Sequence, residues 1–244
     1  MRVFAKSDIG KAREKNEDSY YASQPSETVG LYIVADGMGG YNGGEIASEL
    51  AITATKNYIE SNFAETEHTK EALQQLVKSS IEYANMLVYD KTREMPELEG
   101  MGTTMEVVLV YNNKAYIGHI GDSRIYRIRK EFIRKLTKDH SYVEKLVEEG
   151  KITKDEAVHH PNKNMITKAV GCNKLVEPDI MVKGFIKDDI FVISSDGLTN
   201  MVEEKEIYNA VKNNIETATD LLIEKANEAG GLDNITLIIV QNKN

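Results

Sequence analysis

Apolar positions recur along this chain with two different periods, and each period predicts its own kind of element. In two long stretches, about 44–61 and 69–92, apolar residues return every three or four positions, as on one face of a helix. A shorter stretch of the same kind lies near 217–229, just ahead of a glycine pair. The pattern therefore predicts two long helices in the first half of the chain and one more close to its end.

Short apolar runs around these helices predict strands. The first run, 31–35, is stopped by an Asp-Gly pair and is typical of a buried strand. The other predicted strands are 105–111, 114–120, 124–128, 132–136, 181–185, 189–194 and 235–240. Because Asn112-Asn113 suits a tight hairpin turn, we expect the four runs between 105 and 136 to form one antiparallel meander. Meandering strands with paired helices favour an α+β fold with antiparallel sheets over a doubly wound parallel sheet.

Composition and charge narrow the class of protein. The chain has 244 residues, 41% of them hydrophobic and 28% charged, with no repeat and no linker, so we expect a single domain over 1–244. The net charge of −9 argues against nucleic acid as the main partner. No apolar run approaches the roughly 18 residues of a membrane helix. The first residues have no apolar core of a signal peptide, and one cysteine, Cys172, cannot form an internal disulfide. We therefore expect a cytoplasmic protein without a membrane partner.

Four aspartates share one local context, the end or start of a predicted strand beside glycine. They are Asp36, Asp122, Asp196 and Asp233, and a fifth, Asp18, closes an Asn-Glu-Asp run. Aspartate beside glycine is common in turns, which explains any one of these residues alone. Four such carboxylates gathered at one sheet edge would repel each other, and a hard divalent cation removes that conflict. All-oxygen ligands indicate Mg²⁺ or Mn²⁺ rather than zinc, since the five histidines form no zinc motif.

Three other catalytic motifs are only partly matched. The glycine-rich segment after Asp36 has the order of a dinucleotide site, but Asn42 stands at the third glycine and the aspartate would lie beside the pyrophosphate. Gly121-Asp122-Ser123 is similar to a box of some esterases, yet no Asp-x-x-His occurs to supply acid and base. Ser194-Ser195 lacks the flanking glycines of a nucleophile elbow. Nucleotide binding and serine catalysis are weakly supported.

Six short blocks, taken in order, resemble the signature blocks of the metal-dependent protein phosphatases, the PP2C or PPM family in its compact bacterial form. The blocks are REKNED (13–18), VADGMGG (34–40), GTT (102–104), GHIGDSR (118–124), SSDG (194–197) and DNIT (233–236). Together they span nearly the whole chain. The resemblance implies a four-layer α-β-β-α sandwich, with two central antiparallel β-sheets flanked by pairs of antiparallel helices.

The resemblance also implies a metal-binding role for four aspartates of the blocks. Asp36 would bridge two metal ions, and the Gly37 carbonyl would complete the coordination of one of them. Asp196 and Asp233 would bind the second ion. Asp122, together with Asp196, would supply the site of a third, weaker ion.

Other residues of the blocks would support this centre. Arg13 is the expected phosphate clamp, because a guanidinium presents a planar fork to two phosphoryl oxygens. Glu17 and Asp18 would hold metal-bound waters, and Asn234 would support the site. Met38 stands where many eukaryotic relatives carry a histidine that protonates the leaving group. The leaving-group acid therefore stays open, and our preferred hypothesis is a water on the third ion.

The activity implied by the resemblance is hydrolysis of phosphoserine and phosphothreonine in proteins, by a metal-activated water and without a covalent intermediate. Such an enzyme would need Mn²⁺ or Mg²⁺, would oppose a Ser/Thr protein kinase and would be a monomer. The segment 139–176 resembles the family's flap, which borders the site and influences substrate choice.

Two other function classes are kept as alternatives. One is a binding module that kept the fold and lost its metals, although Asp36, Asp196 and Asp233 are all present. The other is a two-metal phosphodiesterase or nuclease, which uses the same cation chemistry. The acidic charge of the chain and the absence of a basic groove with interleaved aromatic residues oppose it.

Overall fold

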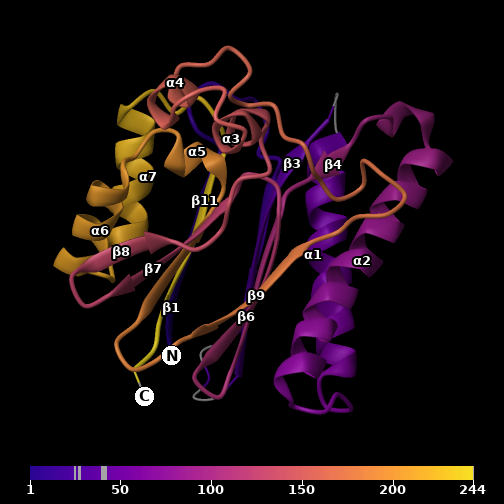
Figure 1. Cartoon of the computed structure of the whole chain (residues 1–244), viewed down its shortest axis with the longest axis horizontal. Helices are drawn as coiled ribbons and strands as arrows, with labels where there is room; N and C mark the ends of the chain where they lie inside the picture. Colours follow the sequence, from indigo (N-terminus) through magenta and orange to yellow (C-terminus); the bar gives the residue numbers. More distant parts are fainter. Residues whose placement is uncertain (25, 27–28, 40–42, 244) are drawn as a thin grey trace.

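The computed structural model describes residues 1–24, 26, 29–39 and 43–243. Gly40 of the second signature block and Asn42 of the dinucleotide alternative lie outside these ranges. Within them, two antiparallel β-sheets lie between helices on both outer sides, which makes a four-layer α-β-β-α sandwich (Figure 1). The predicted α+β class and this architecture are confirmed.

Each sheet combines strands from distant parts of the chain. One sheet has the order β1 (Arg2–Asp8), β11 (Ile235–Gln241), β10 (Ile190–Ser194), β7 (Arg124–Arg129) and β8 (Phe132–Lys135). The other has the order β2 (Asp18–Ala22), β3 (Val29–Met38), β5 (Met105–Tyr111), β6 (Lys114–Ile120) and β9 (Asp179–Gly184), with β4 (Gly102–Thr103) beside β3. In the first sheet, β11 lies between β1 and β10, so the two ends of the described chain meet there.

The helices form two outer layers and a group at one end of the sandwich. The long helices α1 (Gly43–Asn62) and α2 (Lys70–Glu94) cover the second sheet, while α6 (Glu204–Asn213) and α7 (Ala218–Glu228) cover the first (Figure 1). The shorter helices are η1 (Pro96–Leu98), α3 (Tyr142–Glu148), α4 (Lys154–Val158) and α5 (Asp196–Thr199). The predicted helices 44–61, 69–92 and 217–229 correspond to α1, α2 and α7. Helix α2 begins where the Thr69 side chain accepts a hydrogen bond from the backbone N–H of Ala72, and it ends just before Pro96.

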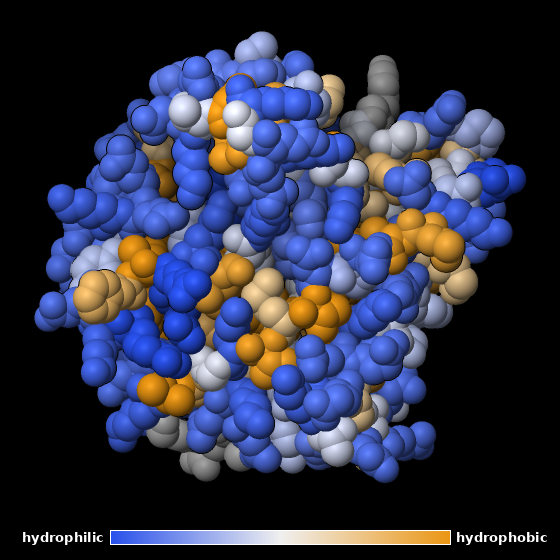
Figure 2. Space-filling model, viewed as in Figure 1, coloured by the Kyte–Doolittle hydropathy of each residue, from blue (hydrophilic) through white to orange (hydrophobic). Residues whose placement is uncertain are grey.

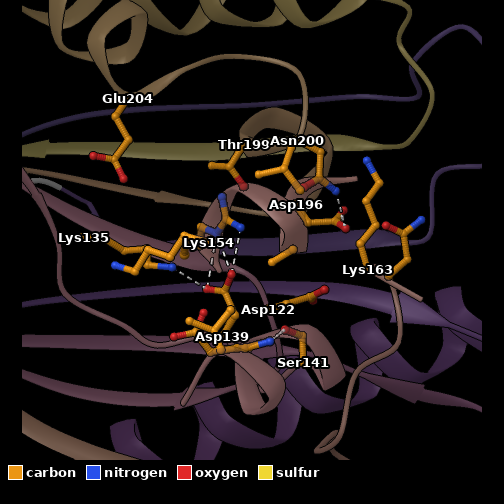
Figure 3. Close-up of a pocket in the computed structure, with 16 residues that line it drawn as sticks. Asp122, Lys135, Asp139, Ser141, Lys154, Lys163, Asp196, Thr199, Asn200 and Glu204 are labelled. Carbon is orange, nitrogen blue, oxygen red and sulfur yellow. Dashed lines mark hydrogen bonds and ion pairs between the residues drawn. The ribbon is translucent and has the colours of Figure 1, made fainter. Parts of the chain in front are cut away.

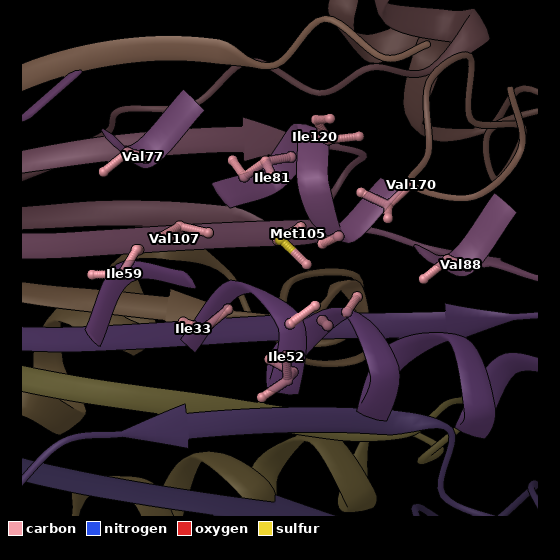
Figure 4. Close-up of a cluster of buried hydrophobic side chains, with 14 of the residues drawn as sticks. Ile33, Ile52, Ile59, Val77, Ile81, Val88, Met105, Val107, Ile120 and Val170 are labelled. Carbon is pink, nitrogen blue, oxygen red and sulfur yellow. The ribbon is translucent and has the colours of Figure 1, made fainter. Parts of the chain in front are cut away.

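Three apolar layers hold the sheets and helices together. In β3, Leu31, Ile33 and Ala35 pack toward α1 and α2, whereas Tyr32 and Val34 pack between the two sheets. Figure 4 shows the outer of these two layers, with Ile33 of β3 beside side chains of the helices. A third layer lies between the first sheet and the helices α6 and α7. Because successive strand residues point to opposite faces, a strand buried on both sides reads as an unbroken apolar run.

The predicted single meander is wrong. Strands β5 and β6 pair as one antiparallel hairpin and β7 and β8 as another, but the two hairpins belong to different sheets. The chain crosses between the sheets at 121–123, where Gly121 takes φ +109°. A Cβ at Gly121 would lie 2.5 Å from the Thr104 side chain. Only glycine fits this turn, and it directs Asp122 to the sheet ends.

Several elements were not predicted. Strands β1, β2 and β4, helix α6 and the short helices η1, α3, α4 and α5 have no counterpart among the predicted segments. In the part of the chain that the structure describes, no helix is long and apolar enough to span a membrane.

Candidate metal centre

The predicted site residues come from separate segments that meet at one end of the sandwich. Asp36 lies near the end of β3, Asp122 lies between β6 and β7, Asp196 begins α5, and Asp233 precedes β11. These four carboxylates line one cavity of about 230 Å³. The other described residues around the cavity are Arg13, Glu17, Gly37, Met38, Gly39, Thr104, Asn164 and Ile166.

Two threonines fix the backbone that carries Asp36. The Asp36 N–H donates to Thr104 Oγ1 at 3.0 Å, and the Asp36 carbonyl accepts from the Thr104 N–H and from Thr103 Oγ1, each at 2.9 Å. Thr104 Oγ1 also lies 2.8 Å from Ser123 Oγ, next to Asp122. The GTT block thus links two of the carboxylate-bearing turns. The pattern of the GTT block by itself does not indicate this position in the site.

Gly37 lies where the chain passes between α1 and the Arg13–Asp18 segment. A Cβ at this position would lie 2.2 Å from the Gly44 carbonyl oxygen and 2.4 Å from that of Glu17. The Gly37 N–H donates to the Glu17 carbonyl at 3.2 Å. A side chain at this position would therefore push apart the two backbones that close the cavity.

Asp233 and Asn234 hold the Arg13–Asp18 segment in place. Arg13 donates from Nη2 to Asp233 Oδ2 at 2.8 Å, and about half of the Arg13 side chain is exposed. Asn234 is buried: its Nδ2 donates to the carbonyls of Ile9 and Lys15, both at 2.9 Å, and its Oδ1 accepts from the Glu17 N–H at 2.8 Å. These bonds fix the loop that carries Arg13 and Glu17 to the cavity.

Asp18 is buried beneath the cavity and does not line it. Its Oδ2 accepts a hydrogen bond from Ser195 Oγ at 2.7 Å, whereas Oδ1 is buried without a hydrogen-bond partner. Burial, with the nearby charges of Asp196 and Asp233, raises the pKa of Asp18 to about 7 despite the hydrogen bond from Ser195. An orphaned carboxylate oxygen at this depth fits a group that turns toward a positive charge or its ordered waters.

The cavity carboxylates destabilise one another's charged forms. Burial raises the pKa of Asp36 well above its usual range, and the neighbouring carboxylates, Asp18 first, raise it further. Burial and then Asp196 raise the pKa of Asp122 to about 7, while burial and then Asp233 raise the pKa of Asp196. A divalent cation among these oxygens would offset both the burial of the charged carboxylates and their mutual repulsion. An all-oxygen donor set suits a hard ion. The residues present therefore fit Mg²⁺ or Mn²⁺.

The side chains nevertheless do not form a closed cage. Among the described residues, no three Asp, Glu, His or Cys side chains lie close enough together to hold one ion by themselves. Asp233 instead contacts Arg13, and Asp196 Oδ2 accepts from Asn200 Nδ2 at 2.9 Å. Each of these two carboxylates has thus turned toward a hydrogen-bond donor of its own chain.

A second cavity of about 410 Å³ adjoins the first and shares Asp122, Asp196 and Asn164 with it. Figure 3 shows Asp122, Asp139 and Asp196 around this second cavity. Asp139 lies in its wall, where Arg124 contacts it through Nε at 3.0 Å and Nη2 at 2.8 Å, and Lys135 at 3.1 Å. Much of the remaining wall comes from the segment 139–176, including Lys154 and Lys163. The segment predicted as a flap thus borders the carboxylate cavity, and its influence on substrate choice stays a prediction.

The family model described as Protein phosphatase 2C matches residues 10–228 of this sequence. The chain belongs to the protein phosphatase 2C family. Its relatives include the protein phosphatase PhpP of Streptococcus pneumoniae, which is 37% identical over 245 residues and is matched over 98% of this chain and 97% of its own.

Solved structures of this family have the same fold. The crystal structure of the Mycobacterium tuberculosis serine/threonine phosphatase PstP/Ppp superimposes with a TM-score of 0.90 at 33% identity, over 100% of this chain and 99% of that one. A structure of the catalytic domain of the serine/threonine protein phosphatase PstP in complex with two manganese ions gives a TM-score of 0.85 at 33% identity, over 98% and 96% of the two chains.

One serine from each of the two hydrolase-like motifs is bonded to another side chain in this phosphatase 2C fold. Ser123 and Ser195 are both fully buried and bonded to Thr104 and Asp18 respectively. Neither hydroxyl faces the cavity as a free nucleophile, which weighs against serine catalysis.

Proposed function

We propose that this chain is a protein serine/threonine phosphatase, a single catalytic domain over 1–244 that hydrolyses phosphoserine and phosphothreonine in proteins. The observation that carries the proposal is the gathering of Asp36, Asp122, Asp196 and Asp233 around one cavity, in a chain similar to solved structures named as serine/threonine phosphatases. The proposed ligands of the two main ions are Asp36, the Gly37 carbonyl, Asp196 and Asp233, and those of a third ion are Asp122 and Asp196.

The metal chemistry sets the reaction class. Bound Mn²⁺ or Mg²⁺ supplies a polarised water for in-line attack on phosphorus and offsets charge on the phosphoryl oxygens. Among the described residues that line the cavity there is no serine, cysteine or histidine, which supports a route without a covalent enzyme intermediate.

The chain's own residues bind and orient the phosphate. Arg13 reaches the cavity from its half-exposed position, and its guanidinium offers two parallel N–H donors to phosphoryl oxygens. Glu17 and Asp18 provide carboxylate oxygens at and beneath the cavity to orient ordered waters, and Asn234 keeps the loop with Arg13 and Glu17 in register. Met38 offers no proton, so the leaving alkoxide must take its proton from another group in the cavity.

The deciding experiment is phosphate release from a phosphoserine or phosphothreonine peptide. We expect release with Mn²⁺ or Mg²⁺, none in EDTA, and losses of more than about 100-fold in Asp36→Asn and Asp233→Ala. Full activity in chelator would refute the proposal, and calorimetry without Mn²⁺ uptake would favour the binding module instead.

A parallel assay addresses the phosphodiesterase alternative. The phosphopeptide should be cleaved much faster than bis-p-nitrophenyl phosphate, because the proposed site binds the three terminal oxygens of a phosphomonoester. The reverse preference would indicate a phosphodiesterase.

Membership of the protein phosphatase 2C family also supports a proposal about where and on what the enzyme acts. We propose that the enzyme acts as a cytoplasmic monomer on proteins phosphorylated by a Ser/Thr kinase. Gel filtration with light scattering tests the monomer, and dephosphorylation of a kinase from the same cell tests the pairing.

A further inference from the structure

Two histidines outside the carboxylate cavity connect it to the segment 139–176. His119 is in β6, and His140 follows β8. Their rings stack with centroids 4.6 Å apart and an interplanar angle of 27°. Neither ring lines the cavity, so the reaction proposed above leaves both without a role.

His119 is anchored in the second sheet. It pairs directly across the strands with Glu106 of β5, and its Nδ1 contacts Glu106 Oε1, with both side chains fully buried. On the other edge of the ring, Nε2 lies 2.7 Å from the carbonyl oxygen of Lys138. A buried pair of this kind is costly to break, so the ring is a fixed surface at the start of the 139–176 segment.

His140 packs on that surface and holds the turn before Asp122. Its backbone N–H donates to the Gly121 carbonyl at 2.7 Å, and its ring Nδ1 accepts from the Gly121 N–H at 3.1 Å. Both polar backbone atoms of Gly121 are thus bonded to one residue. Since glycine has a wide choice of backbone conformations, these two bonds fix Gly121 at its positive φ.

The second ring nitrogen of His140, Nε2, faces a carboxylate that determines which nitrogen carries the proton. Nε2 lies 3.2 Å from Asp179 Oδ2, and Asp179 Oδ1 lies 3.5 Å from Lys168 Nζ. Because Nδ1 accepts a hydrogen bond, the neutral ring carries its proton on Nε2 and donates it to Asp179. The carboxylate thereby selects the tautomer that Gly121 needs.

The same residue also ties the far end of the segment to this turn. The His140 carbonyl accepts from the Thr167 N–H at 2.7 Å, and Tyr142 N–H donates to the Met165 carbonyl at 2.7 Å. Ile166, between the two bonded residues, and Asn164, just before them, line the carboxylate cavity. A shift of His140 would therefore move both the Asp122 turn and this wall of the cavity.

We propose that His140 is a positioning residue that acts through Gly121 to set Asp122 for a divalent ion and to register residues 164–167 against it. The inference rests on the proposed phosphatase function. It makes the binding of the third, weakest ion depend on a residue that touches neither metal nor substrate.

The test compares two substitutions that each keep one half of the ring's bonding. In His140→Asn the amide oxygen can replace Nδ1 as the acceptor for Gly121, whereas in His140→Gln the amide nitrogen can replace Nε2 as the donor to Asp179. We expect His140→Gln to raise the Mn²⁺ Kd of the weakest site, measured by calorimetry, about tenfold, with the tighter sites unchanged. We expect the Mn²⁺ Kd of the weakest site in His140→Asn to stay within about twofold of that of the unmodified chain.

Activity gives the second readout. In His140→Gln the Mn²⁺ concentration for half-maximal phosphopeptide hydrolysis should rise in parallel, whereas KM at saturating Mn²⁺ should change less. His159→Gln is the matched control, because His159 is exposed in the same segment and lines neither cavity. A merely structural role would lower the thermal stability of both His140 variants without separating their Mn²⁺ affinities.

Asp179→Ala keeps the inference testable even if a His140 variant does not fold. Asp179 is partly exposed, and its loss frees the His140 ring to take the other tautomer. We therefore expect the Mn²⁺ Kd of the weakest site to rise two- to fivefold in Asp179→Ala. Equal losses in His140→Asn and His140→Gln, or unmodified Mn²⁺ binding in Asp179→Ala, would overturn the inference. If the unmodified chain itself bound no Mn²⁺, the proposed function would fail instead.

Discussion

Replacing Asn234 by alanine should loosen the loop that carries Arg13 and Glu17. The buried Asn234 side chain makes three hydrogen bonds to that loop, to Ile9, Lys15 and Glu17, at 2.8–2.9 Å. At about 1 kcal/mol net for each bond, the free energy of unfolding should fall by roughly 3 kcal/mol. Since a displacement of about 1 Å in a positioning group can cost on the order of 100-fold in rate, kcat/KM should fall by about that factor.

The matched control for Asn234→Ala is Asn242→Ala, at the other end of β11. Asn242 is equally buried and donates to the Phe185 carbonyl at 2.6 Å, far along the strand from the carboxylates. Urea unfolding should report a lower stability for both variants, and phosphopeptide hydrolysis with Mn²⁺ should separate them. Comparable kcat/KM values in the two variants would show that Asn234 stabilises the fold without positioning the loop.

Three further changes probe the site and its surroundings. Gly37→Ala should destabilise the fold by several kcal/mol and abolish activity, because its Cβ would lie 2.2 Å from a backbone oxygen; Gly184→Ala, with 3.7 Å to its nearest neighbour, should do neither in the same unfolding assay. Arg13→Lys should raise KM for the phosphopeptide about tenfold with little change in melting temperature, since the charge remains but the two-pronged donor is lost; Arg93→Lys is its control. Burial and the neighbouring histidine lower the pKa of His140 from 6.5 to about 4, so its neutral form stabilises the fold above pH 6.5 and that stability is lost as the pH falls toward 4. Between pH 6.5 and pH 4, the free energy of unfolding of the unmodified chain should fall by about 1–2 kcal/mol more than that of His140→Asn. This figure allows for screening by solvent at the partly exposed ring. An equal decrease in the two proteins would contradict the pKa shift.

The sequence predicted those parts of the fold that local patterns determine. The helices α1 and α2 and the paired strands β5 and β6 have clear apolar periods and a turn signal, and the structure gives nearly the same bounds. Strand β1 was missed because all of its residues are only partly buried, which leaves no alternation to read. The division of the two hairpins between the sheets depends on the turn at Gly121 and on packing with Thr104, which no local pattern contains.

The candidate site divides in the same way. Aspartates beside glycine at strand ends could be found from the sequence, because that chemistry is local. The supports of Asp36 could not, since Thr103 and Thr104 lie 67 and 68 residues further along the chain and bind its backbone rather than its carboxylate. Asn164 and Ile166 line the cavity because hydrogen bonds within the 139–176 segment join Met165 and Thr167 to Tyr142 and His140. No residue type in that segment indicates this arrangement.

The central place of β11 in its sheet determines when the enzyme can become active during synthesis. Among the described strands this one is synthesised last, yet it lies between β1 and β10 and directly follows Asp233. Until it emerges, the first strand has no neighbour in its sheet and the Arg13 loop has no Asn234 to bind. A nascent chain or a fragment that stops before this strand can therefore hold most of the fold's residues and still carry no working centre, so unfinished copies leave phosphorylated proteins untouched.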